Sequence, residues 1–224
     1  MSNNFKGLDA RLNAVAFHLE ECDVMADVGC DHGLLSLFVL KNEIAKKVVC
    51  IDISEKCLQK TKNLLSKYNF SNDATFLRCD GLQAVEVPVN VVVIAGMGGI
   101  NISQILENMP QNCKNAKFVL QPMNNITVVR KTLNKLGFRI VRDEIIFDNK
   151  KYYHILCAKQ GKQKLTLDQI RCGAVLEDYR SKDYQKWLQQ KIAKVTNIIS
   201  GVNPQNEKYA ELCEYLSALK KCVF

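Results

Sequence analysis

Residues 24–33 constrain the fold of this chain more than any other stretch. They read Val-Met-Ala-Asp-Val-Gly-Cys-Asp-His-Gly, and an apolar run from Leu34 to Leu40 follows directly. This order predicts a buried strand, a turn that contains glycine and the start of a helix. In doubly wound α/β domains such a turn lies beside a bound ligand at the carboxyl end of the strand.

The residues up to about 160 continue this alternation of helices and apolar strands. The expected strands are 24–28, 48–53, 75–78, 89–95, 118–120, 138–146 and 152–158, and the expected helices are 8–19, 34–40, 55–68, 101–108 and 128–136. Asp148-Asn149-Lys150 suits a hairpin turn between the last two strands. The predicted fold class is α/β, a doubly wound Rossmann-like sheet with an antiparallel edge.

The pattern changes after the polar segment 160–164. Apolar residues recur at steps of three and four over 188–202 and 209–219, which predicts an antiparallel, coiled-coil-like hairpin of two helices. We therefore expect one domain over residues 1–160 and a small helical domain over residues 161–224. Residues 159–224 carry 12 Lys or Arg against 7 Asp or Glu, a balance of 12 − 7 = +5 within a net charge of +8 for the chain. This excess favours an anionic macromolecule as partner, although a solvated helical face explains it as well.

Several classes of protein are excluded by composition. The ten cysteines form no Cys-x-x-Cys pair and the three histidines lie far apart, so we expect reduced thiols and no metal site. No apolar run approaches the length of a membrane span, and the first residues lack the apolar stretch of a signal peptide. We expect a cytoplasmic protein that acts as a monomer away from membranes.

Two kinds of nucleoside ligand compete for the predicted turn. A dinucleotide fingerprint requires Gly-x-Gly-x-x-Gly, whereas this turn has Gly29 and Gly33 with Asp31 between them. A carboxylate at that position would repel a pyrophosphate but tolerates the cationic sulfonium of S-adenosylmethionine. Asp52, about 20 residues further on, has the spacing of an acid that holds ribose hydroxyls. The charge argument favours methyl transfer over dinucleotide oxidoreduction.

Five segments resemble the TrmK family, bacterial tRNA methyltransferases that modify N1 of adenine 22. They are Arg11-Leu12, Asp27 to Gly33, Ile94 to Gly99, Leu120 to Asn124 and Lys151-Tyr152-Tyr153. The resemblance implies a class I methyltransferase domain, S-adenosylmethionine as methyl donor and a helical domain that helps to hold tRNA. The alternative is an RNA-binding protein that keeps a Rossmann-like fold without catalysis.

The cofactor contacts are expected at the carboxyl ends of the first four strands. Asp80 could accept a hydrogen bond from the adenine amino group while Leu82 packs on the ring, and the Gly96 to Gly99 segment leaves bare backbone where donor and acceptor meet. The full expected set is Arg11, Asp27, Gly29, Cys30, Asp31, His32, Gly33, Asp52, Ile53, Asp80, Gly81, Leu82, Ala95, Gly96, Met97 and Gly98.

Asp31 is the expected catalytic residue. Methylation at N1 produces a cationic base that must lose a proton, and a nearby carboxylate could stabilise the charge or accept the proton. The other role open to Asp31 is to cap the helix that begins near Gly33.

The expected tRNA contacts comprise amides, aromatic rings and cations. Gln121 and Asn124 could read an adenine edge, Pro122 would shape their turn, and one of Tyr152 and Tyr153 could stack on a flipped base. Phosphate contacts are expected from Arg130, Lys182, Lys186 and Lys194, each of which could instead be a surface charge.

Overall fold

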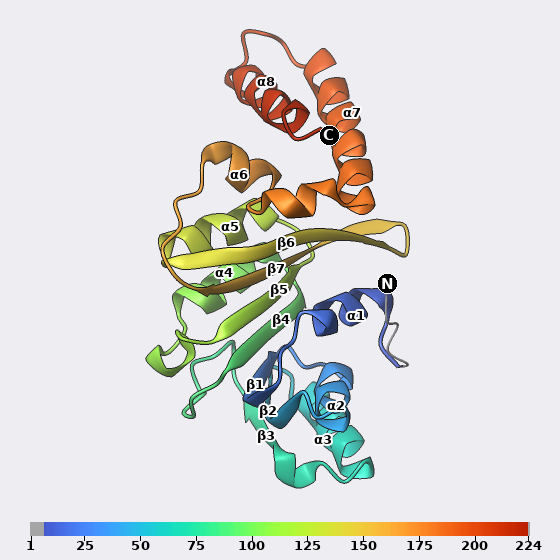
Figure 1. The fold of residues 1–224 in the computed structure, drawn as a ribbon, viewed down its shortest axis with the longest axis vertical. Coiled ribbons are helices and arrows are strands. Elements are labelled where there is room, and N and C mark those ends of the chain that lie inside the picture. The colour runs from blue at the N-terminus through green and yellow to red at the C-terminus, as the bar shows by residue number, and fades with distance from the viewer. Residues whose placement is uncertain (1–6, 224) are drawn as a thin grey trace.

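The structure, a computed structural model, describes residues 7–223 except the side chains of Leu176 and Glu177. Its centre is one seven-stranded sheet in the order β3-β2-β1-β4-β5-β7-β6 (Figure 1). Strand β7 runs antiparallel to β5 and β6, and the other neighbouring strands pair in parallel. The strands are β1 (Cys22–Val28), β2 (Ala45–Asp52), β3 (Ala74–Arg78), β4 (Val91–Met97), β5 (Lys117–Pro122), β6 (Phe138–Asp148) and β7 (Lys151–Gln160). The predicted doubly wound sheet with an antiparallel edge is confirmed.

Helices cover both faces of this sheet (Figure 1). One face carries α1 (Ala10–Phe17), α2 (Leu34–Lys41) and α3 (Glu55–Lys67), and the other carries α4 (Gly99–Glu107) and α5 (Ile126–Lys135).

Strand β4 shows how the apolar run divides between the two faces. Val91 and Val93 belong to the core beneath α1–α3, and Val92 and Ile94 belong to the core beneath α4 and α5. Successive side chains of a strand point to opposite faces, so a continuous β-branched run is buried on both sides.

The predicted helical hairpin is present as α7 (Lys182–Ser200) and α8 (Glu207–Lys220). Val202, expected in the seam of the first helix, instead lies in the turn after α7 ends. Two short elements that precede α7 were not predicted: α6 (Leu167–Cys172) and a 3₁₀ segment (Leu176–Arg180). The signal for α6 was available, because Thr166 and Gln169 form a capping box at its start.

The C-terminal helices form a third apolar cluster against the edge of the sheet. Leu188 and Val195 of α7 meet Ala218 and Leu219 of α8, and Ile145 of β6 belongs to the same cluster. The last residues therefore share core packing with the antiparallel edge of the sheet. None of the helices within residues 7–223 is long and apolar enough to cross a membrane.

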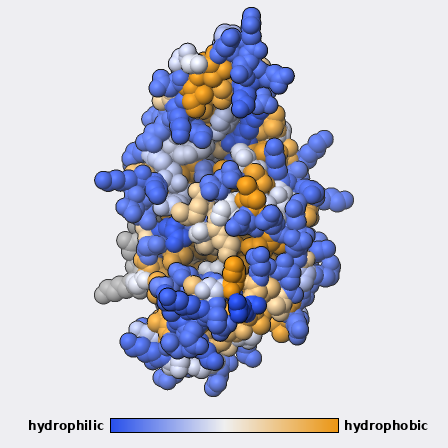
Figure 2. All heavy atoms as spheres, turned by 180° about the vertical axis from the view of Figure 1, so that it is seen from behind, coloured by the Kyte–Doolittle hydropathy of each residue, from blue (hydrophilic) through white to orange (hydrophobic). Residues whose placement is uncertain are grey.

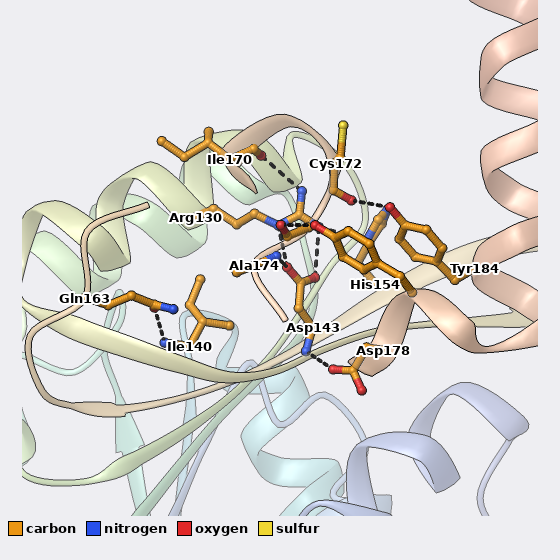
Figure 3. A network of polar contacts seen from close by, with 12 residues as sticks. Arg130, Ile140, Asp143, His154, Gln163, Ile170, Cys172, Ala174, Asp178 and Tyr184 are labelled. Atoms are coloured by element: carbon orange, nitrogen blue, oxygen red, sulfur yellow. Dashed lines mark hydrogen bonds and ion pairs between the residues drawn. The ribbon is translucent and has the colours of Figure 1, made fainter. Parts of the chain in front are cut away.

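Arg130 does not contact solvent, which contradicts its predicted role on phosphate. Its side chain is 1% exposed and donates two hydrogen bonds of 2.8 Å to the carboxylate of Asp143 on β6 (Figure 3). The remaining donors reach the carbonyl of Ile170 and the ring of His154. The prediction failed because a single charged residue on a predicted helix gives no sign of a buried partner 13 positions away.

The same network joins the sheet to the segment that leads into the helical hairpin. Asp143 accepts the N–H of Ala174 at 2.6 Å, and its own N–H donates to Asp178 at 2.7 Å. Figure 3 shows these groups converging between α5, β6 and the chain before α7. Arg130 therefore acts as a structural bridge.

We expect Arg130→Met to destabilise the protein by about 3–5 kcal/mol, because Asp143 would remain buried without its cation. The free energy of unfolding from urea titration would show this loss. Lys135→Met on the same helix removes only an exposed ion pair with Glu107 and should change stability by less than about 1 kcal/mol. Equal effects of the two substitutions would contradict the bridging role.

Candidate active site

The turn after β1 has a backbone that favours glycine at three alternate positions. Gly29, Asp31 and Gly33 have φ values of 74°, 47° and 71°. A Cβ atom at Gly29 would lie 2.3 Å from the methyl group of Met97, the last residue of β4, so a side chain there would displace the end of the Met97 side chain. Asp31 thus occupies the position that glycine holds in a dinucleotide turn, in a conformation that Asp tolerates better than most residues.

A cleft of about 360 Å³ opens between this turn, the start of α1 and the end of β4. Nine of the predicted cofactor residues line it. They are Arg11, Asp27, Gly29, Cys30, Asp31, His32, Ala95, Gly96 and Met97, with Leu12, Leu34 and Leu35 completing the walls.

Asp27 brings a buried carboxyl group to this cleft. Burial raises its pKa to about 6, against an opposing hydrogen bond of 2.6 Å from the hydroxyl of Ser36. The neighbouring charge of Asp52 raises the pKa further. A cation bound in the cleft would favour the ionised form of this group.

Asp52 lies at the end of β2 with its carboxylate already oriented. Its two oxygens accept the N–H groups of Asp31 at 3.2 Å and Ser54 at 2.9 Å. An ionised carboxylate offers about four acceptor positions, so lone pairs remain for the hydroxyls of a ribose. Ile53 is 64% exposed beside it, and Asp80 is exposed at the end of the next strand, β3. These three residues fit the sugar and the base of a nucleoside.

Contrary to the prediction, Leu82 and Gly81 do not present a surface to a ligand. Leu82 is 1% exposed and belongs to the core beneath α4, and Gly81 is buried against Ile105. The sequence put Leu82 beside the ring because it follows Asp80 closely, but an apolar residue in a loop often turns inward. Gly33 and Gly98 hold the N-cap positions of α2 and α4.

The structure argues against the capping role for Asp31. Gly33 occupies the N-cap of α2, while the Asp31 carboxylate accepts the thiol of Cys57 and lies 3.4 Å from the ring of His32. Lys60 contacts the same His32 ring at 2.9 Å. The Asp31 side chain is 70% exposed at the cleft, free to approach a bound molecule.

Gln121 is a positioning residue and not a reader of the base edge. It is fully buried, and its amide oxygen accepts Arg11 at 2.8 Å and the N–H of Gly96 at 3.1 Å. Its amide nitrogen donates to the carbonyl of Pro122. The amide is therefore committed to holding the loop after β4 and the side chain of Arg11 in place.

The loops after β4 and β5 are bonded to each other. Met123 donates its N–H to the carbonyl of Met97 at 2.8 Å, and Asn124 accepts the N–H of Gly99 at 3.2 Å. A Cβ atom at Gly99 would lie 2.5 Å from the carbonyl oxygen of Asn124, so only glycine permits this approach. Asn124 thereby lies beside the segment where a methyl donor and its acceptor would meet.

A second cavity, here called the hairpin groove, continues from the loop after β5. It has a volume of about 830 Å³ and lies between residues 122–127 and the facing sides of α7 and α8. Tyr152 lines it, whereas Tyr153 pairs with Ile146, which packs on the opposite face of the sheet. The prediction that at most one of the two tyrosines faces the site is consistent with this arrangement.

Sequence reasoning missed the residues that α7 brings to this groove. Trp187 and Lys191 line it, and they lie on α7 beside the predicted apolar seam. Lys182, Lys186 and Lys194 are exposed on the same helix but do not line the groove, so their contact with phosphate stays a prediction. Among the described residues no cluster of three or more His, Cys, Asp or Glu side chains could hold a metal ion.

Comparisons with known proteins agree with this geometry. The family model described as "Methyltransferase domain" matches residues 8–156. The tRNA (adenine(22)-N(1))-methyltransferase of Bacillus subtilis is 25% identical over 96% of this chain and 97% of its own length. The crystal structure of Sp1610 from Streptococcus pneumoniae superposes with a TM-score of 0.90, at 27% identity over 97% of this chain and 100% of that one. The same protein has been solved with S-adenosyl-L-methionine, at a TM-score of 0.86, 26% identity and coverage of 97% and 100%.

The family match spans the strands and turns that build the cleft, and the similarity to the B. subtilis enzyme extends through the helical hairpin. This chain belongs to the methyltransferase-domain family and, within it, to the TrmK family.

Proposed function

We propose that this protein transfers the methyl group of S-adenosylmethionine to N1 of adenine 22 in tRNA. The observation that carries the proposal is the cleft itself, in which the turn after β1 and the loop after β4 face each other at the carboxyl edge of the sheet. The similarity to the B. subtilis enzyme over 96% of the chain supports the choice of acceptor. Because tRNA is the substrate, we also propose that the protein works in the cytoplasm. We propose a monomer as its working form.

The residues of the cleft, together with those that follow β2 and β3, fit S-adenosylmethionine. Asp52 would hold the ribose, Ile53 and Asp80 would lie beside the adenine, and the carboxylates of Asp27 and Asp31 suit a positively charged ligand. When bound, the cofactor supplies an electrophilic methyl group on a cationic sulfur. Arg11, which Gln121 orients, would face the carboxylate end of the cofactor.

The chain mainly has to position the acceptor base. Neutral adenine carries a lone pair at N1 and needs no base to become nucleophilic, so alignment can supply about 7–11 kcal/mol of the barrier. Gly96 and Gly98 leave room for the base to approach, and Asn124 bounds that space. Asp31 would stabilise the cationic product and accept the proton that its exocyclic nitrogen later loses.

We propose that residues 161–224 form the part of the protein that holds tRNA outside the cleft. Lys182, Lys186 and Lys194 are exposed along α7 and would contact phosphates.

The reaction is tested with a tRNA transcript and its adenine 22→guanine variant. We expect one methyl group per tRNA on the first transcript, at N1 of adenine 22, and none on the second. Mass spectrometry of nuclease digests reports both the modified nucleoside and its position. Equal methylation of the two transcripts would contradict the assignment of the target.

Asp52→Ala should weaken binding of S-adenosylmethionine at least tenfold, since hydrogen bonds to a charged group contribute about 1.5–3 kcal/mol each. Titration calorimetry measures the change. Asp23→Ala is the matched control, because it removes an exposed carboxylate from the opposite end of the sheet. Absence of cofactor binding in the wild-type protein would instead favour an RNA-binding protein without catalysis.

Asp31→Asn should lower kcat by about 100-fold or more if the carboxylate takes part in proton transfer. Affinity for S-adenosylmethionine should fall much less, because the backbone N–H that contacts Asp52 is kept. Single-turnover kinetics and circular dichroism separate loss of chemistry from loss of folding. A folded variant with wild-type turnover would remove Asp31 from the mechanism.

A further inference from the structure

The hairpin groove has aromatic side chains from three elements. Tyr152 comes from β7, Trp187 from α7 and Tyr215 from α8, and all three line the cavity. The Trp187 ring is held by edge contacts with His154, at 5.2 Å between centroids, and by Tyr184 behind it at 5.5 Å. Burial, with the nearby charges of Arg130 and Lys191, lowers the pKa of His154 well below its usual value, so this neighbour is uncharged at neutral pH. The arrangement presents planar apolar surface inside a cavity.

Positive charge surrounds this aromatic surface. Arg171, Lys191 and Lys208 line the groove against one acid, Glu211. Arg171 has a partner in Glu214 at 3.6 Å, whereas Lys191 forms no ion pair among the side chains that the structure describes. Lys191 is partly buried in the wall of the groove, where burial and the neighbouring charge of Lys194 lower the pKa of its ammonium group. An anionic group bound beside Lys191 would favour its charged form. Such a cation attracts an anionic group to the cavity.

The groove begins where the acceptor site ends. Pro122 and Asn124 line the groove, and Asn124 accepts the N–H of Gly99, the first residue of α4. Met123, which also lines the groove, donates its N–H to the carbonyl of Met97 in the cofactor cleft at 2.8 Å, so the groove and the cleft adjoin at this pair of residues. Seen from behind, hydrophobic side chains form patches at the end of the hairpin and across the middle of the molecule, set among hydrophilic ones (Figure 2).

We propose that the hairpin groove binds a second, unpaired nucleotide of the tRNA, a neighbour of the methylated adenine. Its base would stack among Trp187, Tyr152 and Tyr215, and its phosphate would contact Lys191. The inference rests on the proposed function and deepens it. In this arrangement the groove selects tRNA in which a nucleotide next to the target adenine is unpaired.

The chemistry of the groove favours this occupant over others. Proteins recognise unpaired bases by stacking them on aromatic side chains with cations at the backbone, and any base can stack in this way. A volume of about 830 Å³ lies within the range of pockets that enclose small ligands, and it is too confined for a base-paired helix. An apolar peptide would leave Lys191 without a partner.

The protein contains one tryptophan, so Trp187 reports directly on the groove. We expect its fluorescence to change saturably on titration with the tRNA transcript in the absence of S-adenosylmethionine. A short single-stranded tetra-adenylate should produce the same change at higher concentration, whereas an RNA duplex of equal charge should not. No change in emission at saturating tRNA would overturn the proposal.

Substitutions test the phosphate contact. Lys191→Ala should raise the Kd for tRNA about tenfold and lower kcat/KM for tRNA to a similar extent, while the KM for S-adenosylmethionine stays unchanged. Lys220→Ala removes the same charge from an exposed position on α8 outside the groove and should change Kd by less than twofold. Tyr152→Leu should weaken binding of tetra-adenylate, because it removes an aromatic ring while the positive charge of Lys191 is kept.

The outcomes separate this inference from the reaction itself. If Lys191→Ala and Lys220→Ala behave alike while the wild-type protein methylates adenine 22, the groove proposal is wrong and the proposed function stands. If the groove binds tetra-adenylate through Lys191 but the protein transfers no methyl group, the groove proposal is supported and the reaction is not.

Discussion

The ion pair between Arg130 and Asp143 determines how the C-terminal helices are attached to the sheet. Both side chains are almost completely buried, and Asp143 also binds the backbone of Ala174. Buried ion pairs often contribute little net stability, because removing two charges from water costs about as much as their attraction returns. What this pair supplies is geometry: its hydrogen bonds have directions, and they fix the segment before α7 against β6. Together with the apolar cluster that includes Ile145 of β6, this attachment holds α7 and α8 over the loop after β5, where the hairpin groove lies.

The cofactor cleft depends on a different principle, the gathering of carboxylates. Asp27 is buried with its pKa raised to about 6, and Asp52 lies near enough to contribute to that shift. A carboxyl group whose pKa is raised by folding stabilises the folded state at pH values below the pKa it has in the unfolded chain. This stabilisation is lost as the pH rises through the folded-state pKa of about 6. At neutral pH the ionised Asp27 is therefore a destabilising negative charge, which a cationic ligand would offset. Functional sites commonly carry such a cost.

Glycine and amide groups then bring the two halves of the site together. Gly99 permits the loop after β5 to contact the start of α4, and the buried amide of Gln121 holds Gly96 and Arg11. Neither Gln121 nor Gly99 would touch the base or the cofactor in our proposal. Substituting either residue would act indirectly, by moving the neighbouring residues that do contact these ligands.

The sequence by itself determined the order of strands and helices, the turn after β1, the acid at position 52 and the helical hairpin. These features depend on periodicity, on glycine and on spacing within one strand–helix unit, all of which are local. Arg130, Gln121 and Leu82 were misjudged because their roles depend on partners or packing from distant segments, as with Asp143 for Arg130 and Arg11 for Gln121. The hairpin groove was not predicted for the same reason, since its lining residues come from several elements between Pro122 and Tyr215. Only the tertiary structure could decide which charges are buried in pairs and which face a ligand, because burial is a property of how the segments pack together.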